Sequence, residues 1–234
     1  MTRDVTILAP VTSAAGNARR PETRARIAAG IPDGKRLLDV LLGGIALVLA
    51  MPIILVAGAL VRITSPGPAL YRQLRVGQGE RPFTMFKLRT MRINTDDRAH
   101  RDFNARELLT NTAARDGVFK LEADPRITPI GRILRRYSID ELPQLLNVIR
   151  GEMSLVGPRP SLPWEVSLYT PDQRRRHECL PGITGLWQVS GRNHLSMTEM
   201  LAMDLAYAEQ RSMKLDLWIL LRTPKAVLCD ESVR

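Results

Sequence analysis

The stretch from Val40 to Val61 reads VLLGGIALVLAMPIILVAGALV and decides the fold class, since none of its 22 residues has a charged or polar side chain. As an α-helix it would be about 33 Å long, enough to cross a hydrocarbon core of about 30 Å. A buried core helix is the alternative, but such helices are usually much shorter. The stretch also begins too late and is too long for a secretory signal peptide. We therefore expect a membrane helix here.

Pro52 lies near the middle of this stretch, where it removes a backbone hydrogen bond and bends a helix. Both flanks are basic: residues 1–39 carry seven bases and four acids, and residues 62–99 carry eight bases and three acids. The positive-inside rule would keep both flanks in the cytoplasm. A re-entrant helix that breaks at Pro52 and returns to the same face satisfies both observations. Pro also occurs in ordinary spanning helices, so on these grounds a spanning helix stays open.

The rest of the chain predicts an α-rich α+β domain with one short β-hairpin. Ala69–Val76 and Phe83–Met91 read as strands around a glycine-containing turn. Short helices are expected over residues 131–137 and 142–150, and a longer one after the capping box Ser196-x-x-Glu199. The apolar segment 215–221 suits either packing against the core or the membrane interface.

These patterns divide the chain into four parts. We expect a disordered basic N-terminal tail (1–34), a re-entrant membrane helix (35–65), a small cytosolic domain (66–228) and a C-terminal tail (229–234).

The charge balance indicates an anionic partner. The chain has 34 Lys and Arg against 24 Asp and Glu, a formal net charge of +10. Aromatic residues make up only 5%, too few for a surface that stacks many bases, so phosphates or lipid head groups fit better than nucleic acid. The two cysteines and three histidines lack the spacing of a zinc site or a disulfide framework.

Asp140 and Glu141 are the best candidates for chemistry. An acid in the first turn of a helix is stabilised as its anion, and the same helix end can bind phosphate. A carboxylate there could attack phosphorus, provided that cations neutralise the phosphate. The cations nearby in sequence are Arg132, Arg135, Arg136, Arg150 and Arg159.

A structural reading of the same residues stays open. Ser138-x-x-Glu141 is itself a capping box, which would make Glu141 only structural. Pro143 then falls late in the first turn, and a helix that starts with Asp140 as its cap avoids this problem. An ordinary solvated surface and a basic patch that faces the membrane both stay open as readings of the arginines.

Two further cations, Lys87 and Arg89, lie on the second predicted strand. The preceding turn, Gly77-x-Gly79, has neither the dinucleotide-binding nor the P-loop form. A nucleotide-binding P-loop is therefore not indicated, and no Gly-x-Ser-x-Gly elbow is present.

A series of motifs carries a resemblance to a known family. They are Lys35-Arg-x-x-Asp39, the mid-helix Pro52, Ser65-Pro-Gly-Pro68, Phe86-Lys-Leu-Arg-Thr-Met91, Asp124-Pro-Arg-Ile-Thr128, Asp140-Glu-Leu-Pro-Gln144, Ser154-Leu-Val-Gly-Pro-Arg-Pro160 and Pro181-Gly-Ile-Thr-Gly-Leu-Trp-Gln-Val-Ser-Gly-Arg192. From about residue 35 to 228 the chain resembles the bacterial sugar transferases, the monotopic phosphoglycosyl transferases that act on polyprenyl phosphate. Leu88 departs from the pattern, because the family usually has an aromatic residue there; this bears on packing more than on chemistry.

The resemblance implies a re-entrant helix broken at Pro52 and a catalytic domain on the cytoplasmic face of the bacterial inner membrane. It also implies that Asp140 attacks the sugar-proximal phosphorus of a UDP-sugar, releasing UMP, and that the phosphate of undecaprenyl phosphate then takes over the phosphosugar. Glu141 would handle protons or help to hold Mg²⁺, with Asp140 as the other metal ligand. The phosphate-binding candidates are Lys87, Arg89, Arg135, Arg136 and Arg159.

The sugar is not fixed by these motifs. Small transferases of this shape resemble those that start exopolysaccharide synthesis with galactose or glucose, and we expect one of these hexoses. Competing hypotheses are a catalytically inactive scaffold of a polysaccharide assembly complex and a basic membrane module that binds nucleic acid or anionic lipid. A homodimer is compatible with the sequence but is not required by it.

Overall fold

The structure is a computed structural model that describes residues 33–93, 98–110, 124–191 and 195–228. The tails expected over 1–34 and 229–234 therefore lie outside the described residues, apart from residues 33 and 34. The helices and strands in chain order are α2 (Asp33–Thr64), β1 (Leu70–Val76), η1 (Gln78–Glu80), β2 (Pro82–Leu88), α3 (Arg98–Thr110), α4 (Pro129–Arg136), η3 (Ile139–Gln144), α5 (Leu145–Arg150), β3 (Ser154–Val156), α6 (Pro163–Leu168), α7 (Pro171–Arg174), η4 (Arg175–Glu178), β4 (Gly182–Thr184), α8 (Leu186–Ser190), α9 (Met197–Gln210) and α10 (Met213–Leu228).

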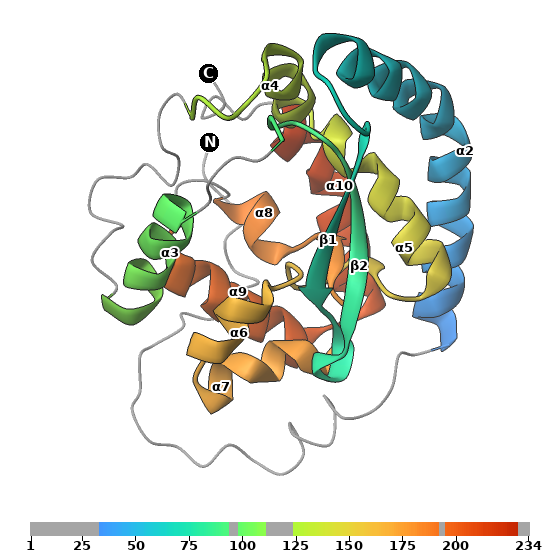
Figure 1. Cartoon of the computed structure of the whole chain (residues 1–234). Coiled ribbons are helices and arrows are strands. Elements are labelled where there is room, and N and C mark those ends of the chain that lie inside the picture. The colour runs from blue at the N-terminus through green and yellow to red at the C-terminus, as the bar shows by residue number, and fades with distance from the viewer. Residues whose placement is uncertain (1–32, 94–97, 111–123, 192–194, 229–234) are drawn as a thin grey trace, which may run out of the picture.

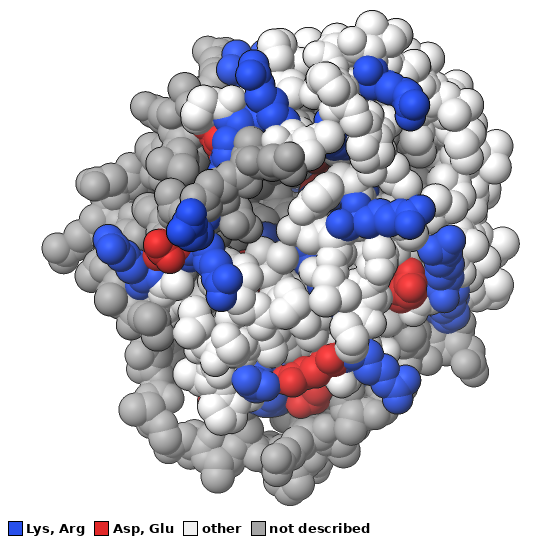
Figure 2. All heavy atoms as spheres, in the orientation of Figure 1, with Lys and Arg blue, Asp and Glu red and all other residues white. Residues whose placement is uncertain are grey.

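The apolar stretch forms a single element, α2. Within the described ranges it is the one helix long and apolar enough to cross a membrane, with a mean hydropathy of 2.8 over a window that is only 17% buried. Figure 1 shows α2 running along one side of the molecule and turning over its top, as Pro52 inside a helix leads us to expect. The surface over α2 in Figure 2 is mostly uncharged. The predicted membrane helix fits this arrangement, whereas its re-entrant path stays a prediction.

Lys35, Arg36 and Asp39, which we call the α2 anchor, hold the start of α2 to the rest of the protein. The Lys35 ammonium forms a 2.5 Å ion pair with Asp216 of α10 and donates a 3.2 Å hydrogen bond to the Tyr207 hydroxyl of α9. The Tyr207 hydroxyl itself donates to Asp216 at 2.7 Å. Both partners are buried, so these contacts join three helices in a water-poor environment.

The other two anchor residues bind backbone groups. Arg36 donates to the carbonyls of Val148 at 2.7 Å and Ile149 at 2.9 Å, which lie in the last turn of α5. A cation there also complements the negative end of the helix dipole. Asp39 is 1% exposed and accepts a 2.9 Å bond from the amide of Leu155 in β3. The first motif of the sequence thus attaches the apolar helix to the domain.

The predicted β-hairpin is confirmed. β1 and β2 pair antiparallel from Leu70↔Leu88 to Val76↔Pro82, and Figure 1 shows them crossing the centre of the molecule. The turn between them contains Gly79 at φ 64°, a left-handed conformation that glycine adopts without strain. β2 ends three residues earlier than predicted, and Met91 instead forms an isolated bridge with Ile127.

A short parallel pair, β3 and β4, was not predicted. Ser154↔Gly182 and Val156↔Thr184 are its paired residues. A Cβ atom added to Gly182 would lie 2.1 Å from the amide nitrogen of Gly157, so only glycine permits this approach of two backbones. The glycines of the last two sequence motifs therefore bring those motifs side by side.

The core lies between the hairpin, α5, α9, α10 and the inner face of α2. Ile219 in α10 is fully buried while Leu221 is 82% exposed, so the segment 215–221 packs one face on the core and leaves the other uncovered. Leu88, where the family pattern has an aromatic residue, packs with Ala57 and Val61 of α2. The main cluster consists of Ala50, Met85, Leu145, Val148, Met153, Leu155, Val156, Leu186, Tyr207 and Ile219.

Candidate active site

Asp140 and Glu141 lie in a 3₁₀ helix, η3, which also contains Pro143. The α-helix predicted over residues 142–150 therefore begins three residues later, at Leu145 of α5. Ser138 precedes η3 in a left-handed conformation, φ 53°, and its side chain makes no cap hydrogen bond. The capping-box reading is therefore wrong, and so is the alternative in which Asp140 is the cap.

Glu141 contacts a candidate cation instead of capping the helix. The Lys87 ammonium of β2 lies 2.9 Å from its Oε1. Lys87 and Glu141 are only partly exposed, with 23% and 32% of their side chains accessible. The structure thus brings together two site candidates that are 54 residues apart in sequence.

Asp140 is 7% exposed, and its environment changes its acidity. Burial and the charge of Glu141 raise the pKa of Asp140 to about 6, while Lys87 and Arg135 act in the opposite direction. The carboxylate is therefore ionised at neutral pH but lies close to its titration point. An anion with little solvation and two cations nearby is suited to attack an electrophile.

Arg135 is positioned by the segment before η3. Thr128 caps α4 by accepting a 3.0 Å bond from the amide of Gly131, and Arg135 in the last turn of α4 donates to the Thr90 hydroxyl at 2.9 Å. Burial lowers the pKa of Arg135 and the charge of Asp140 raises it, which places the two charges near each other. The motif at residues 124–128 therefore orients a cation towards the candidate nucleophile.

A small cavity of about 100 Å³ is lined by Glu141 and Lys87, whereas Asp140 and Arg135 do not line it. Its lining contains Lys87 of β2, Glu141 of η3 and Arg159 of the segment after β3. A larger hollow of about 480 Å³ lies at the hairpin turn and holds none of the candidate residues, so the smaller cavity is the candidate site. The full lining of the small cavity is Arg75, Met85, Lys87, Glu141, Gln144, Arg159, Pro160, Gly182, Ile183, Trp187 and Gln188.

Two predicted phosphate-binding residues lie elsewhere. Arg89 is 7% exposed and donates to the carbonyls of Ser65, at 2.7 Å, and Pro66, so it holds the turn after α2. Arg136 is exposed, with its guanidinium 5.7 Å from the centre of the Tyr137 ring. Neither residue lines the cavity. The arginines at 132 and 150 are exposed as well.

Sequence reasoning missed three residues of the cavity wall. Arg75 is 6% exposed and comes from β1, and Trp187 and Gln188 belong to the last motif. The indole Nε1 of Trp187 and the Oε1 of Gln188 are buried and have no hydrogen-bond partner among the described residues. Unpaired buried polar atoms beside a cavity are typical of a site that binds a polar ligand. A basic residue within a strand was the available signal for Arg75, but Arg72 of the same strand carries it as well and is exposed.

The donor set for a metal ion is limited to carboxylates at this site. Within the described ranges no group of three or more His, Cys, Asp or Glu side chains is arranged to hold a metal ion. The adjacent carboxylates of Asp140 and Glu141 fit an ion such as Mg²⁺, which takes one or two protein carboxylates and completes its coordination with phosphate oxygens and water.

Comparison with known proteins identifies close relatives. The model of the family described as bacterial sugar transferase matches residues 32–230. The exopolysaccharide production protein ExoY of Sinorhizobium fredii is 41% identical over 196 residues, which cover 82% of this chain and 84% of that protein.

Two more relatives have names that state a reaction. The UDP-glucose:undecaprenyl-phosphate glucose-1-phosphate transferase of Caulobacter vibrioides is 39% identical over 206 residues, covering 85% of this chain and 71% of that protein. The undecaprenyl-phosphate galactose phosphotransferase of Salmonella typhimurium is 39% identical over 198 residues, covering 83% of this chain and 40% of that protein.

Proposed function

The chain belongs to the bacterial sugar transferase family, and we propose that it transfers a sugar-1-phosphate from a UDP-sugar to undecaprenyl phosphate with release of UMP. One observation carries this proposal: Asp140 is buried within the charge fields of Glu141 and Lys87, and these two residues line a cavity together with Arg159. The named reactions of two relatives support the substrate class, and the name of ExoY supports a role in exopolysaccharide production.

The proposed reaction has two displacement steps at one phosphorus atom. A carboxylate oxygen of Asp140 attacks the sugar-bearing phosphorus, the bond to the bridging oxygen breaks, and UMP leaves with that oxygen. A phosphate oxygen of the lipid then attacks the same phosphorus, and the bond to Asp140 breaks. Lys87 and Arg159 neutralise the phosphate charge, so that two anions can approach each other. The carboxylate is regenerated, and the product is undecaprenyl-diphospho-sugar.

We propose that Asp140 and Glu141 hold Mg²⁺ when it binds. The ion would supply positive charge to the substrate diphosphate. Glu141 is held by Lys87, at 2.9 Å, in a position next to the nucleophile. The role of the residues themselves is to place the Asp140 carboxylate for attack and to hold the Glu141 carboxylate beside it through Lys87.

The proposed function is tested by UMP release from purified enzyme with Mg²⁺ and undecaprenyl phosphate. We expect release from UDP-galactose or UDP-glucose, and little from the N-acetylated UDP-sugars in the same panel. If folded, lipid-supplied protein released no UMP from any UDP-sugar, the scaffold hypothesis would replace this one.

The rate is expected to fall in acid. Asp140 attacks only as its anion, and its pKa is raised to about 6 by burial and Glu141. Protonation removes the nucleophile, so kcat/KM for the UDP-sugar should drop about tenfold per pH unit below the midpoint, and bound Mg²⁺ should move that midpoint to below pH 6 because its charge favours the anion. Initial rates of UMP release from roughly pH 4.5 to pH 8 would show the midpoint.

Removing the charge of Glu141 and removing that of Lys87 should move the pH midpoint of the rate in opposite directions. The charge of Glu141 raises the pKa of Asp140 and that of Lys87 lowers it. Glu141→Gln should therefore shift the midpoint to lower pH, and Lys87→Met should shift it to higher pH, although both variants turn over slowly. Equal shifts in one direction would contradict the assignment of Asp140 as the titrating nucleophile.

We further propose that α2 is re-entrant and that the domain lies on the cytoplasmic face of the inner membrane. Pro52→Ala restores a backbone donor and removes the bend, so the helix should straighten and span the bilayer. Single cysteines placed within residues 1–34, in a background without Cys179 and Cys229, would then be labelled from the periplasmic side. Ile53→Ala, at a neighbouring exposed position, is the control and should leave the labelling cytoplasmic. Unchanged cytoplasmic labelling of Pro52→Ala would defeat the prediction.

A further inference from the structure

We propose that Arg75 binds phosphoryl oxygens of a substrate at the cavity wall, as a second arginine beside Arg159. The inference rests on the proposed function for the identity of the substrates. It adds a substrate-binding residue that lies outside every sequence motif described above.

The guanidinium of Arg75 is oriented by two neighbours and keeps spare donors. Its Nη1 donates to the carbonyl of Pro160 at 2.8 Å, and its Nε and Nη2 donate to the side-chain oxygen of Gln73 at 3.2 and 2.8 Å. A guanidinium has five N–H donors, so each terminal nitrogen retains one. Two donors in a fixed fork match the geometry of phosphate oxygens.

The charges around the cavity are unbalanced. Its wall contains the cations Arg75, Lys87 and Arg159 and a single acid, Glu141, which pairs with Lys87. Burial, and then the charge of Arg159, lower the pKa of Arg75 to about 9. The repulsion from Arg159 shows that the two guanidinium groups lie close together, and an anion between them would relieve it. The cavity wall therefore has the charge of a site that takes an anionic group.

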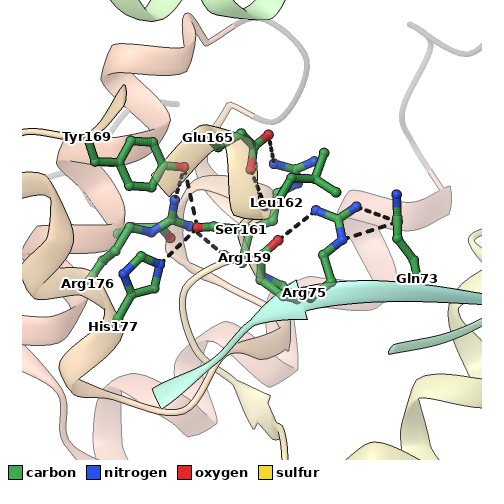
Figure 3. Close-up of polar contacts among 11 residues, drawn as sticks. Gln73, Arg75, Arg159, Ser161, Leu162, Glu165, Tyr169, Arg176 and His177 are labelled. Atoms are coloured by element: carbon green, nitrogen blue, oxygen red, sulfur yellow. Dashed lines mark hydrogen bonds and ion pairs between the residues drawn. The ribbon is translucent and has the colours of Figure 1, made fainter. Parts of the chain in front are cut away.

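The nearest buried acid serves to hold Arg159. Glu165 is fully buried, lies 3.3 Å from the Arg159 guanidinium and accepts a 2.6 Å bond from the amide of Leu162 (Figure 3). It thus fixes the side chain of Arg159 and the turn that follows it. This leaves Arg75 with no carboxylate in hydrogen-bond contact among the described residues.

A second buried cation, Arg176, fixes the backbone at Arg159. Arg176 donates a 2.6 Å bond to the carbonyl of Arg159 and pairs with Asp204 of α9. Because Arg75 binds the next carbonyl, that of Pro160, both arginines are held by one short segment (Figure 3). Such preorganised cations stabilise an anion without reorganising when it arrives.

An independent observation also points to a ligand at this wall. Trp187 lines the cavity, is 9% exposed, and its Nε1 has no partner among the described residues. An indole N–H is a donor only, so the partner it lacks is an acceptor such as a phosphoryl oxygen. Arg75, Arg159 and Trp187 together offer donors from three separate segments of the chain.

The test measures binding without turnover. UDP and a short-chain polyprenyl phosphate should each be titrated against the wild type and Arg75→Gln, with the thermal midpoint as the readout, because a ligand that binds the folded state raises it. Arg72→Gln is the matched control, since Arg72 is exposed and points to the other face of β1. We expect Arg75→Gln to weaken binding of at least one ligand tenfold or more, and Arg72→Gln to bind both ligands as the wild type does.

The two ligands show whether Arg75 binds the diphosphate of the UDP-sugar or the phosphate of the lipid carrier. Loss of UDP binding alone assigns Arg75 to the donor diphosphate, and loss of lipid binding alone assigns it to the carrier. Unchanged binding of both ligands by Arg75→Gln, or no stabilisation of the wild type by either, overturns the proposal. If Arg75→Gln does not fold, Arg75→Lys takes its place, and wild-type affinity in that variant overturns the proposal too. UMP release by the wild type is scored separately, so a failure of the proposed reaction is distinguishable from a failure of this site.

Discussion

Asp140→Asn should abolish UMP release, with a loss of turnover on the order of 10⁴ or more. The amide has nearly the shape of the carboxylate but lacks an anionic oxygen to attack phosphorus. The variant should fold well, because Asp140 is 7% exposed and replacing a buried anion by a neutral group removes a cost of burial. The loss is therefore chemical rather than structural.

The covalent intermediate gives a second readout of the same assignment. UDP-sugar labelled in the sugar should leave acid-stable label on the wild type when the lipid is absent, and none on Asp140→Asn. Glu141→Gln should accumulate some label although its turnover is badly impaired, since its nucleophile is intact. Appreciable turnover or labelling of Asp140→Asn would mean that another residue is the nucleophile.

The largest effect on stability is expected from Asp204→Asn. Asp204 is 1% exposed and forms a 2.5 Å ion pair with Arg176, whose side chain is 3% exposed. Removing one partner of a buried pair leaves the other charge without compensation, which typically costs about 3–5 kcal/mol. For a chain of this size that corresponds to a fall of roughly 10 °C in the thermal midpoint.

Glu80→Gln is the matched control for this prediction. Glu80 pairs with Arg174 at 3.1 Å, but the two side chains are 41% and 40% exposed. Exposed pairs contribute only about 0–1 kcal/mol, so the control should unfold close to the wild-type temperature. Similar thermal midpoints for Asp204→Asn and Glu80→Gln would show that the Arg176–Asp204 pair does not stabilise the fold.

The sequence alone predicts those helices and strands whose characteristic residues lie within one short segment. The length and apolarity of α2, the alternation and glycines of the hairpin, and the capping box that opens α9 with Ser196 and Glu199 each lie within one segment, and each is found in the structure. These features depend on backbone geometry within a few residues, which a single stretch of sequence specifies.

The site was less predictable because it depends on the direction in which each side chain points from its strand or helix. Lys87 and Arg89 are two residues apart and would share a face of a continued strand, but β2 ends at Leu88 and the two side chains diverge. Arg135 and Arg136 are neighbours on a helix, where successive side chains point about 100° apart, so one alone turns towards Asp140. A contact between two segments that are far apart in the sequence cannot be predicted from either segment alone.

The α2 anchor ties the height of the small cavity, the one lined by Lys87 and Arg159, to the position of the apolar helix. It fastens the start of α2 to β3 and α10, and Arg159 follows β3 by three residues. The domain cannot slide along the helix to suit a thicker or thinner lipid layer. Hydrophobic mismatch is therefore met by tilting the whole protein or by deforming the lipid around it, at a cost of fractions of a kcal/mol per Å. On the proposed function, the thickness of the membrane then affects the rate, since it sets how far the phosphate of the lipid carrier must move to reach the cavity.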